Sequence, residues 1–287
     1  CTGVFRQGGI GMKLSSRGKP LVIIITIVLL FILLFPFFVM LSTMVRPSTE
    51  VYLSPQVWIS EHFRFYNFID VWSQYNLGTY FFSSFIIAVG SMVLNIALSI
   101  PAGYAIARLR FPGKRFALYF FLIVQMFSPV IVVISLFRLF SIFHLRDTFI
   151  GLIVIDTVFT LAFSIWLMNG YFSTIPKEIE EAAFIDGCTR VGTITRIMIP
   201  IAAPGLVTTM IYTFIYAWNE FLFALSFINT KDKMPLTVGI YNFVGRWSTQ
   251  WEYLTTAAFL AIIPVIILFY FIEKQLVAGL AGGAVKG

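Results

Sequence analysis

Charged residues are scarce in this sequence, and several kinds of chemistry are missing with them. Asp, Glu, Lys and Arg make up 11% of the 287 residues, against roughly 25% in an average soluble domain. The two histidines, His62 and His144, do not form the His-x-x-x-His pair of a zinc site. Gly113-Lys114 lacks the flanking residues of a phosphate-binding loop, and no Gly-x-Ser-x-Gly elbow occurs. We therefore expect no metal site, no ATP hydrolysis and no covalent catalysis on this chain itself.

Hydrophobic residues, by contrast, make up 59% of the chain, and Phe alone occurs 32 times. A chain of this composition cannot hide its apolar surface in a soluble core, so it is predicted to be a multi-pass membrane protein. Six apolar stretches are long enough to cross a bilayer, at roughly 21–44, 80–106, 116–140, 149–171, 203–227 and 254–277. The expected fold is therefore an all-α polytopic membrane protein with six transmembrane helices. Proline predicts kinks in four of them, at Pro36, Pro101, Pro129 and Pro264.

The distribution of positive charge orients these spans. Thirteen of the 20 Lys and Arg residues fall on the side shared by both termini, and seven fall on the other side. Cytoplasmic loops carry the excess of positive charge, so both termini are expected in the cytoplasm. The net charge of +7 then reflects these loops and not a nucleic-acid partner. Cys1 and Cys188 both fall on this reducing side, so no disulfide is predicted.

The chain is thus expected to have three parts. Residues 1–20 form a cytoplasmic N-terminal segment, residues 21–277 the transmembrane domain, and residues 278–287 a cytoplasmic C-terminal tail. Residues 1–11 are left out of the fold prediction, because Met12 is a natural initiator and what precedes it is expected to be partly foreign to the protein.

Residues 176–200, between the fourth and fifth predicted spans, form the longest segment of mixed charge. A helix is expected to begin at Pro176, where a missing N–H costs nothing, and to end at Gly187, which tolerates left-handed backbone angles. A second short helix is expected to follow from Thr189 and to stop at Pro200. The pattern predicts two short helices outside the bilayer, a shape that suits docking into a groove on a soluble partner.

Within this segment, one set of residues resembles the coupling motif of the permease subunits of ATP-binding-cassette importers: Glu181, Ala182, Ala183, Asp186, Gly187, Ile197 and Pro200. Cys188 stands where that family usually has alanine. The run from Ala217 to Phe221 and the ending from Gly282 to Gly287 are similar to the carbohydrate branch, and most of all to the smaller maltose-type permease. The resemblance covers nearly the whole chain after about residue 20.

The resemblance implies a permease that moves a sugar or oligosaccharide into the cytoplasm by alternating access. It implies a second homologous permease subunit, two ATPase subunits that bind ATP and Mg, and an extracytoplasmic solute-binding protein, in the cytoplasmic membrane of a bacterium or archaeon. This chain itself would bind no cofactor, would contact membrane lipid and would be a transport subunit, not an enzyme. In the family, the loop at 229–252 reaches toward the binding protein. The tail enters the ATPase interface, here through Gly282, Gly283 and Lys286.

Polar residues within the predicted spans are candidates for lining the translocation path, because each is costly in lipid unless it faces a cavity or a partner. They are Asn219, Glu220, Asn169, Gln125 and Asn95. Adjacent residues on a helix point about 100° apart, so Asn219 and Glu220 cannot both face the centre of a narrow pore. The alternative for each is a hydrogen bond between helices or a place near the membrane interface.

Other functions stay open from the residues alone. A secondary transporter or channel driven by an ion gradient would use Asp156 and Glu220 as proton carriers. A membrane enzyme acting on lipid would need a cluster of His, Asp or Glu near an interface, and the sequence shows none. Within the importer class, the alternative is a non-sugar solute such as glycerol phosphate or a polyol.

Overall fold

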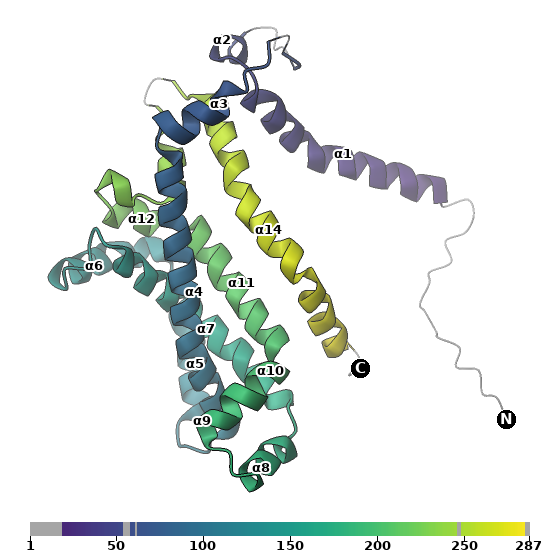
Figure 1. Ribbon diagram of the computed structural model, residues 1–287, viewed down its shortest axis with the longest axis vertical. Helices are drawn as coiled ribbons and strands as arrows, with labels where there is room; N and C mark the ends of the chain where they lie inside the picture. Colours follow the sequence, from purple (N-terminus) through teal and green to yellow (C-terminus); the bar gives the residue numbers. More distant parts are fainter. Residues whose placement is uncertain (1–18, 54–57, 61, 246–247, 285–287) are drawn as a thin grey trace.

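Helices dominate the computed structural model, which describes residues 19–53, 58–60, 62–245 and 248–284 (Figure 1). Within these ranges no strand forms, and the only β-type pairing is an isolated antiparallel bridge between Val244 and Thr249. The all-α prediction is confirmed. Four helices are long and apolar enough to cross a membrane: α1 (Lys19–Met44), α4 (Leu77–Arg108), α7 (Phe149–Thr174) and α14 (Trp251–Ala284).

Two bent pairs of helices are candidates for further spans. Helices α5 (Lys114–Gln125) and α6 (Pro129–Ile142) meet at 98°, and the helical run Arg190–Ile201 meets α11 (Ala203–Asn219) at 83°. Pro129 explains the first bend, because it forces Ser128 into an extended conformation and starts a new helix. If each pair is one span, length and composition allow up to six, the number that the sequence predicts.

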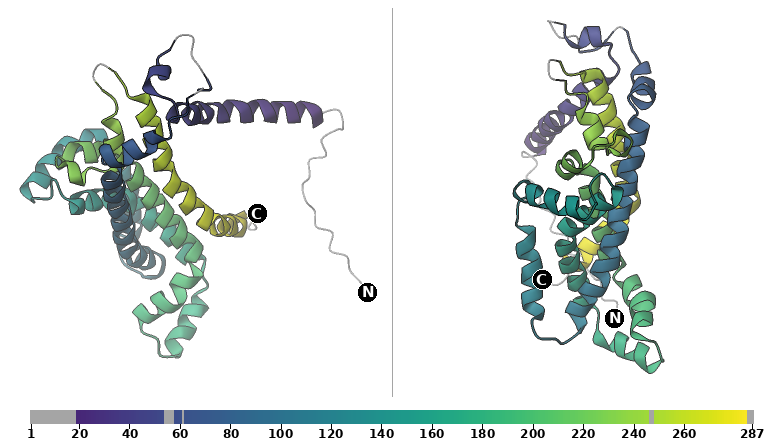
Figure 2. Two further views of the ribbon diagram at one scale, coloured as in Figure 1. Left: turned by 45° about the horizontal axis from the view of Figure 1, so that its top comes forward. Right: turned by 90° about the vertical axis from the view of Figure 1, so that its left-hand side faces the viewer.

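The core of the bundle is formed by α4, α7 and α11, which lie side by side in both figures (Figures 1 and 2). Gly103 of α4 permits a close approach, since a Cβ there would lie 2.7 Å from the Cβ of Met168 on α7. Polar side chains join the same two helices: the amide nitrogen of the buried Asn95 donates to the hydroxyl of Thr160 at 2.8 Å. This packing and this hydrogen bond join α4 to α7.

Helix α1 leads away from the other helices in all views and packs mainly against α14 (Figures 1 and 2). Large side chains are exposed around its whole circumference, among them Phe31 at 70% and Leu33 at 66%. An apolar helix without a protein neighbour on most sides needs lipid or another chain to cover it.

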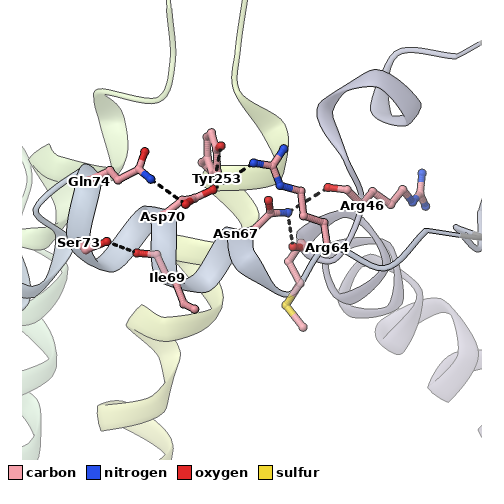
Figure 3. Close-up of polar contacts among 9 residues, drawn as sticks. Arg46, Arg64, Asn67, Ile69, Asp70, Ser73, Gln74 and Tyr253 are labelled. Atoms are coloured by element: carbon pink, nitrogen blue, oxygen red, sulfur yellow. Dashed lines mark hydrogen bonds and ion pairs between the residues drawn. The ribbon is translucent and has the colours of Figure 1, made fainter.

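Polar contacts hold the far end of α1 to α3 (Tyr66–Ile69), as Figure 3 shows, and to α14. The fully buried Asn67 donates from its side chain to the carbonyls of Met44 at 2.9 Å and Arg46 at 3.0 Å. The hydroxyl of Thr256 on α14 also donates to the Met44 carbonyl, at 3.2 Å. Thus α1 is anchored through its last residues, while the side chains along most of its length stay exposed.

A second group of contacts in Figure 3 centres on Asp70, the first residue of the π-helix η1 (Asp70–Gln74). Arg64 forms an ion pair with its carboxylate at 3.2 Å, and the Gln74 amide donates to it at 2.9 Å. The hydroxyl of Tyr253 on α14 lies 3.5 Å away. These contacts order the long segment between the first two spans.

Short helices fill the remaining connections. They are α2 (Ser48–Val51), α8 (Lys177–Ile185), α9 (Arg190–Thr193), the π-helix η2 (Ile194–Met198), α10 (Ile199–Ile201), α12 (Leu222–Phe227), the 3₁₀ turn η3 (Lys231–Lys233) and α13 (Leu236–Tyr241).

The prediction of a fifth span from 203 to 227 as one helix is wrong, because α11 ends at Asn219. The Glu220 carboxylate accepts hydrogen bonds from the amides of Phe223 at 2.7 Å and Ala224 at 2.9 Å, and so starts α12 as a separate helix.

Candidate functional site

The segment predicted to couple the chain to a partner lies at one end of the molecule, where α8 and α9 project beyond the bundle (Figure 1). Helix α8 ends as the sequence predicts. The amide of Cys188 donates to the Ala183 carbonyl at 3.0 Å, and the amide of Gly187 donates to the Phe184 carbonyl at 3.1 Å. Gly187 has a φ of +83°, so this is a Schellman ending that requires a left-handed residue.

The second part of the segment begins as predicted and ends differently. Thr189 caps α9, since its hydroxyl accepts a hydrogen bond from the amide of Gly192 at 3.2 Å. Pro200 does not stop the helical run, which continues to Ile201. The π-helix η2 ends at Met198, two residues before this proline, and its wider turn leaves room for a ring that would clash with the carbonyl of residue 196 in an α-helix.

The motif residues divide by exposure. Five are exposed: Glu181, Ala182, Asp186, Gly187 and Pro200. The other two are less exposed, namely the buried Ala183 and the half-buried Ile197. The exposed side also presents large apolar side chains, of which Ile185 is 86% exposed and Val191 70% exposed. The segment therefore offers a mixed apolar and acidic surface, with small residues that allow close approach.

Sequence reasoning missed the residue that anchors this segment. Glu180 is only 8% exposed, unlike its neighbours Glu178 and Glu181. Its carboxylate accepts a hydrogen bond from the Tyr104 hydroxyl and lies 3.1 Å from Nε of Arg108, both on α4. The signal available in the sequence was the helical period: Glu180 is three residues before the buried Ala183 and so shares its face.

The candidates for the translocation path do not gather at one place. Asn95 is fully buried between α4 and α7, where it donates a hydrogen bond to Thr160. This is the alternative interpretation, in which the residue forms a hydrogen bond between helices. Gln125 donates to the Tyr212 hydroxyl at 3.0 Å and so joins α5 to α11. Asn219 is exposed and donates back to the carbonyl of Ile215 at 2.8 Å, within its own helix.

The two other candidates also differ from one another. Glu220 is half-buried and is used to start α12, as described above. Asn169 is half-buried near the α8 end of α7. Of the five candidates, Asn219 is the one whose side chain is exposed, so it stays the leading prediction for contact with a solute.

At the opposite end from α8, Asp147 ties the start of α7 to the segment after α12. Its carboxylate accepts hydrogen bonds from the amides of Asn229 and Thr230, each at 3.0 Å, and from the Thr230 hydroxyl. Lys233 forms an ion pair with it at 3.7 Å. The hydrogen bonds from Thr230 are the main cause that lowers the pKa of Asp147 to about 2. The loop predicted to face a binding protein is therefore held at its base.

The predicted tail is helical up to Ala284. Helix α14 continues past the expected end at Val277 to Ala284 and includes the backbone of Gly282 and Gly283. Lys286 lies outside the described residues. Elsewhere in the described ranges, no group of three or more His, Cys, Asp and Glu residues is placed to hold a metal ion.

Comparison with known proteins agrees with this geometry. Residues 99–281 match the family described as the binding-protein-dependent transport system inner membrane component. The sulfoquinovosyl glycerol transport system permease protein SmoH of Agrobacterium fabrum is 33% identical over 96% of this chain and 97% of its own length. The trehalose/maltose transport system permease protein MalG of Thermococcus litoralis is 33% identical over 96% of this chain and 100% of its own.

Solved structures show the same fold. A chain from a bacterial ABC transporter involved in the import of the acidic polysaccharide alginate superposes with a TM-score of 0.79 at 22% identity, covering 91% of this chain and 98% of that one. The family model covers more than half of the sequence and includes the coupling segment. This chain therefore belongs to the family of inner-membrane permease components of binding-protein-dependent ABC importers, as the resemblance in its sequence predicts.

Proposed function

We propose that this chain is one permease subunit of an importer that moves a sugar or oligosaccharide into the cytoplasm, driven by ATP hydrolysis on separate subunits. The observation that carries the proposal is the coupling segment: α8 and α9 project from the bundle and present an exposed surface of small, acidic and apolar residues. A chain with no phosphate-binding loop of its own needs such a surface to receive mechanical work from an ATPase.

The cargo is proposed from the relatives. Their names specify sulfoquinovosyl glycerol, trehalose or maltose, and diacetylchitobiose, all of which contain sugar units. A solute-binding protein is proposed as the donor, which would dock on the side away from α8, where Asp147 holds the base of the segment after α12. The five path candidates stay proposals, with Asn219 first because its side chain is exposed.

A second permease subunit is supported by apolar surface that this chain leaves uncovered. An apolar groove of about 560 Å³ lies between α4, α11 and α14, lined by side chains such as Phe85, Met210 and Ile267. Helix α1 is exposed on most of its length. Membrane lipid would cover what the second permease does not. With six spans, both termini and α8 would lie on the cytoplasmic side.

The test is gentle solubilisation of native membranes and purification of the chain by an N-terminal tag, with identification of the proteins that follow it. A second permease and an ATPase are expected. The co-purifying binding protein is then screened against trehalose, maltose and diacetylchitobiose. Uptake that needs ATP and the binding protein supports the proposal. A chain that purifies alone, with uptake that collapses with the ion gradient, would refute it in favour of a secondary transporter.

A further inference from the structure

The inner face of α8 carries one buried carboxylate, and its surroundings differ from those of every other acid in the coupling segment. Glu180 is 8% exposed, whereas Glu178, Glu181 and Asp186 are exposed. The exposed acids are available to a partner. Glu180 is not, because it is directed at α4.

The side chain of Arg108 lies beside this carboxylate and connects α4, α7 and α8. Nε of Arg108, the last residue of α4, lies 3.1 Å from Oε2 of Glu180, an ion pair without the alignment of a hydrogen bond. Nη2 of Arg108 donates to the carbonyl of Ile175, the C-cap of α7, at 2.6 Å. The hydroxyl of Tyr104, one turn earlier on α4, donates to Oε1 of Glu180. Arg108 and Tyr104 together thus tie α8 to α4 and α7.

The surroundings make this link stiff. The side chains of Arg108 and Glu180 are 6% and 11% exposed, so water competes weakly for their charges. The ring of Tyr104 packs edge-on against Phe172 of α7, with centroids 6.1 Å apart. A buried pair of this kind strongly resists separation, because removing either partner leaves an uncompensated buried charge.

Helix α4 is held at its other end as well. The hydroxyl of Ser84 accepts a hydrogen bond from the amide of Leu236 at 2.8 Å, and the hydroxyl of Ser83 donates to the carbonyl of Asp232 at 3.3 Å. One continuous helix therefore joins the coupling segment to the segment that holds η3 and α13. A displacement of α8 has a direct mechanical route across the whole bundle.

We propose that Tyr104, Arg108 and Glu180 form a rigid link that transmits the movement of α8 to α4, so that they act as positioning residues for transport. The inference rests on the proposed docking of α8 on an ATPase. With the link intact, the ATPase pair closes only by moving the transmembrane helices. With the link broken, α8 moves by itself, and the ATPases lose this restraint.

The test measures ATP hydrolysis by the purified intact transporter without binding protein or sugar, so it does not depend on the identity of the cargo. Glu180→Gln removes the charge and keeps the shape, and Tyr104→Phe removes only the hydrogen bond. The control is Arg110→Gln, which removes an exposed charge just after α4 and outside the coupling segment. Energetic coupling between two sites typically changes an affinity by a factor of about 5 to 150. We expect Glu180→Gln to raise this hydrolysis at least about 5-fold, Tyr104→Phe to raise it less, and Arg110→Gln to leave it unchanged.

A merely structural role would move the same readout in the other direction or not at all. Unchanged or lower hydrolysis by Glu180→Gln, in complexes that retain their ATPase subunits, would overturn the proposal. Failure of the unaltered chain to retain any ATPase would instead refute the proposed function, and this inference with it.

A second experiment replaces the native link between α8 and α4 by a chemical cross-link. In a chain with Cys1 and Cys188 replaced by alanine, Glu180→Cys combined with Arg108→Cys breaks the native link, and a short bis-maleimide restores a covalent one. Hydrolysis is expected to rise in the double variant and to return to the low rate after cross-linking. A rate that stays high despite complete cross-linking would show that a rigid connection between α8 and α4 is not what restrains the ATPases.

Discussion

Replacing Gly187 by glutamate is expected to weaken docking of the ATPase while leaving this chain folded. Gly187 has a φ of +83°, and a Cβ built on it meets no atom within 4 Å. The new side chain therefore collides with nothing in this chain, and its internal cost is the left-handed backbone alone, about 1–2 kcal/mol. Against a typical stability of about 5–15 kcal/mol, nearly all molecules stay folded.

The same substitution has a different effect on the surface that would dock on the ATPase. A glutamate at the tip of the coupling segment enters the space that the ATPase groove would fill, next to the exposed Asp186. Forcing extra atoms into a packed contact costs about 1–3 kcal/mol, or roughly 5- to 150-fold in affinity. The backbone strain lowers the stability of the chain, whereas the steric clash lowers its affinity for the partner, so the two effects can be measured separately.

The chain offers a matched control in Gly113, between α4 and α5. It has a φ of +84°, and a Cβ there also meets no atom within 4 Å. Gly113→Glu imposes the same backbone strain outside the coupling segment. The assay is the amount of ATPase retained by each tagged variant after washing, with the yield of folded chain as reference. Retention is expected to fall for Gly187→Glu alone; equal retention by both variants would refute the assignment of the coupling segment.

Three further outcomes follow from the described contacts. Because the pKa of Asp147 is lowered to about 2, its stabilisation is present above pH ~4 and lost as the pH falls toward 2. Asp147→Asn should speed hydrogen exchange of the Thr230 amide about 5-fold at pH 7, and this difference should shrink below pH 4. Glu220→Ala removes the acceptor for the first amides of α12 and should cost about 1 kcal/mol, measured as faster exchange in α12 only. Asn95→Ala should lower the unfolding temperature, at a cost of about 1 kcal/mol for the lost bond to Thr160, while leaving ATPase retention unchanged.

Much of the fold could be predicted because membrane insertion constrains sequence strongly. Long apolar stretches predicted the four long helices, and Pro129 predicted the bend between α5 and α6. The ending of α8 was predicted from Gly187, since only a residue that tolerates positive φ completes a Schellman motif there. These features depend on residues that are close together in the sequence, so they can be predicted from it directly.

The errors have a common origin in contacts that are not local or not α-helical. The predicted fifth span overlooked that a carboxylate can start a new helix, as Glu220 does for α12. The predicted stop at Pro200 overlooked the π-turn that accommodates it. The role of Asn95 as a path residue stays a prediction, but its burial follows from the register of α4 against α7, which no single stretch specifies.

The sequence by itself determined that this chain is a helical membrane protein of the permease family, and it predicted a coupling segment outside the bilayer, because composition, proline, glycine and a specific motif act over short distances. Only the tertiary structure decided which face of α8 is inward. Glu180 and Arg108 are 72 positions apart in the sequence, and their ion pair exists because the ends of α4 and α7 converge where α8 begins. Helical periodicity defines the faces of a helix, but the neighbouring helices determine which face becomes buried.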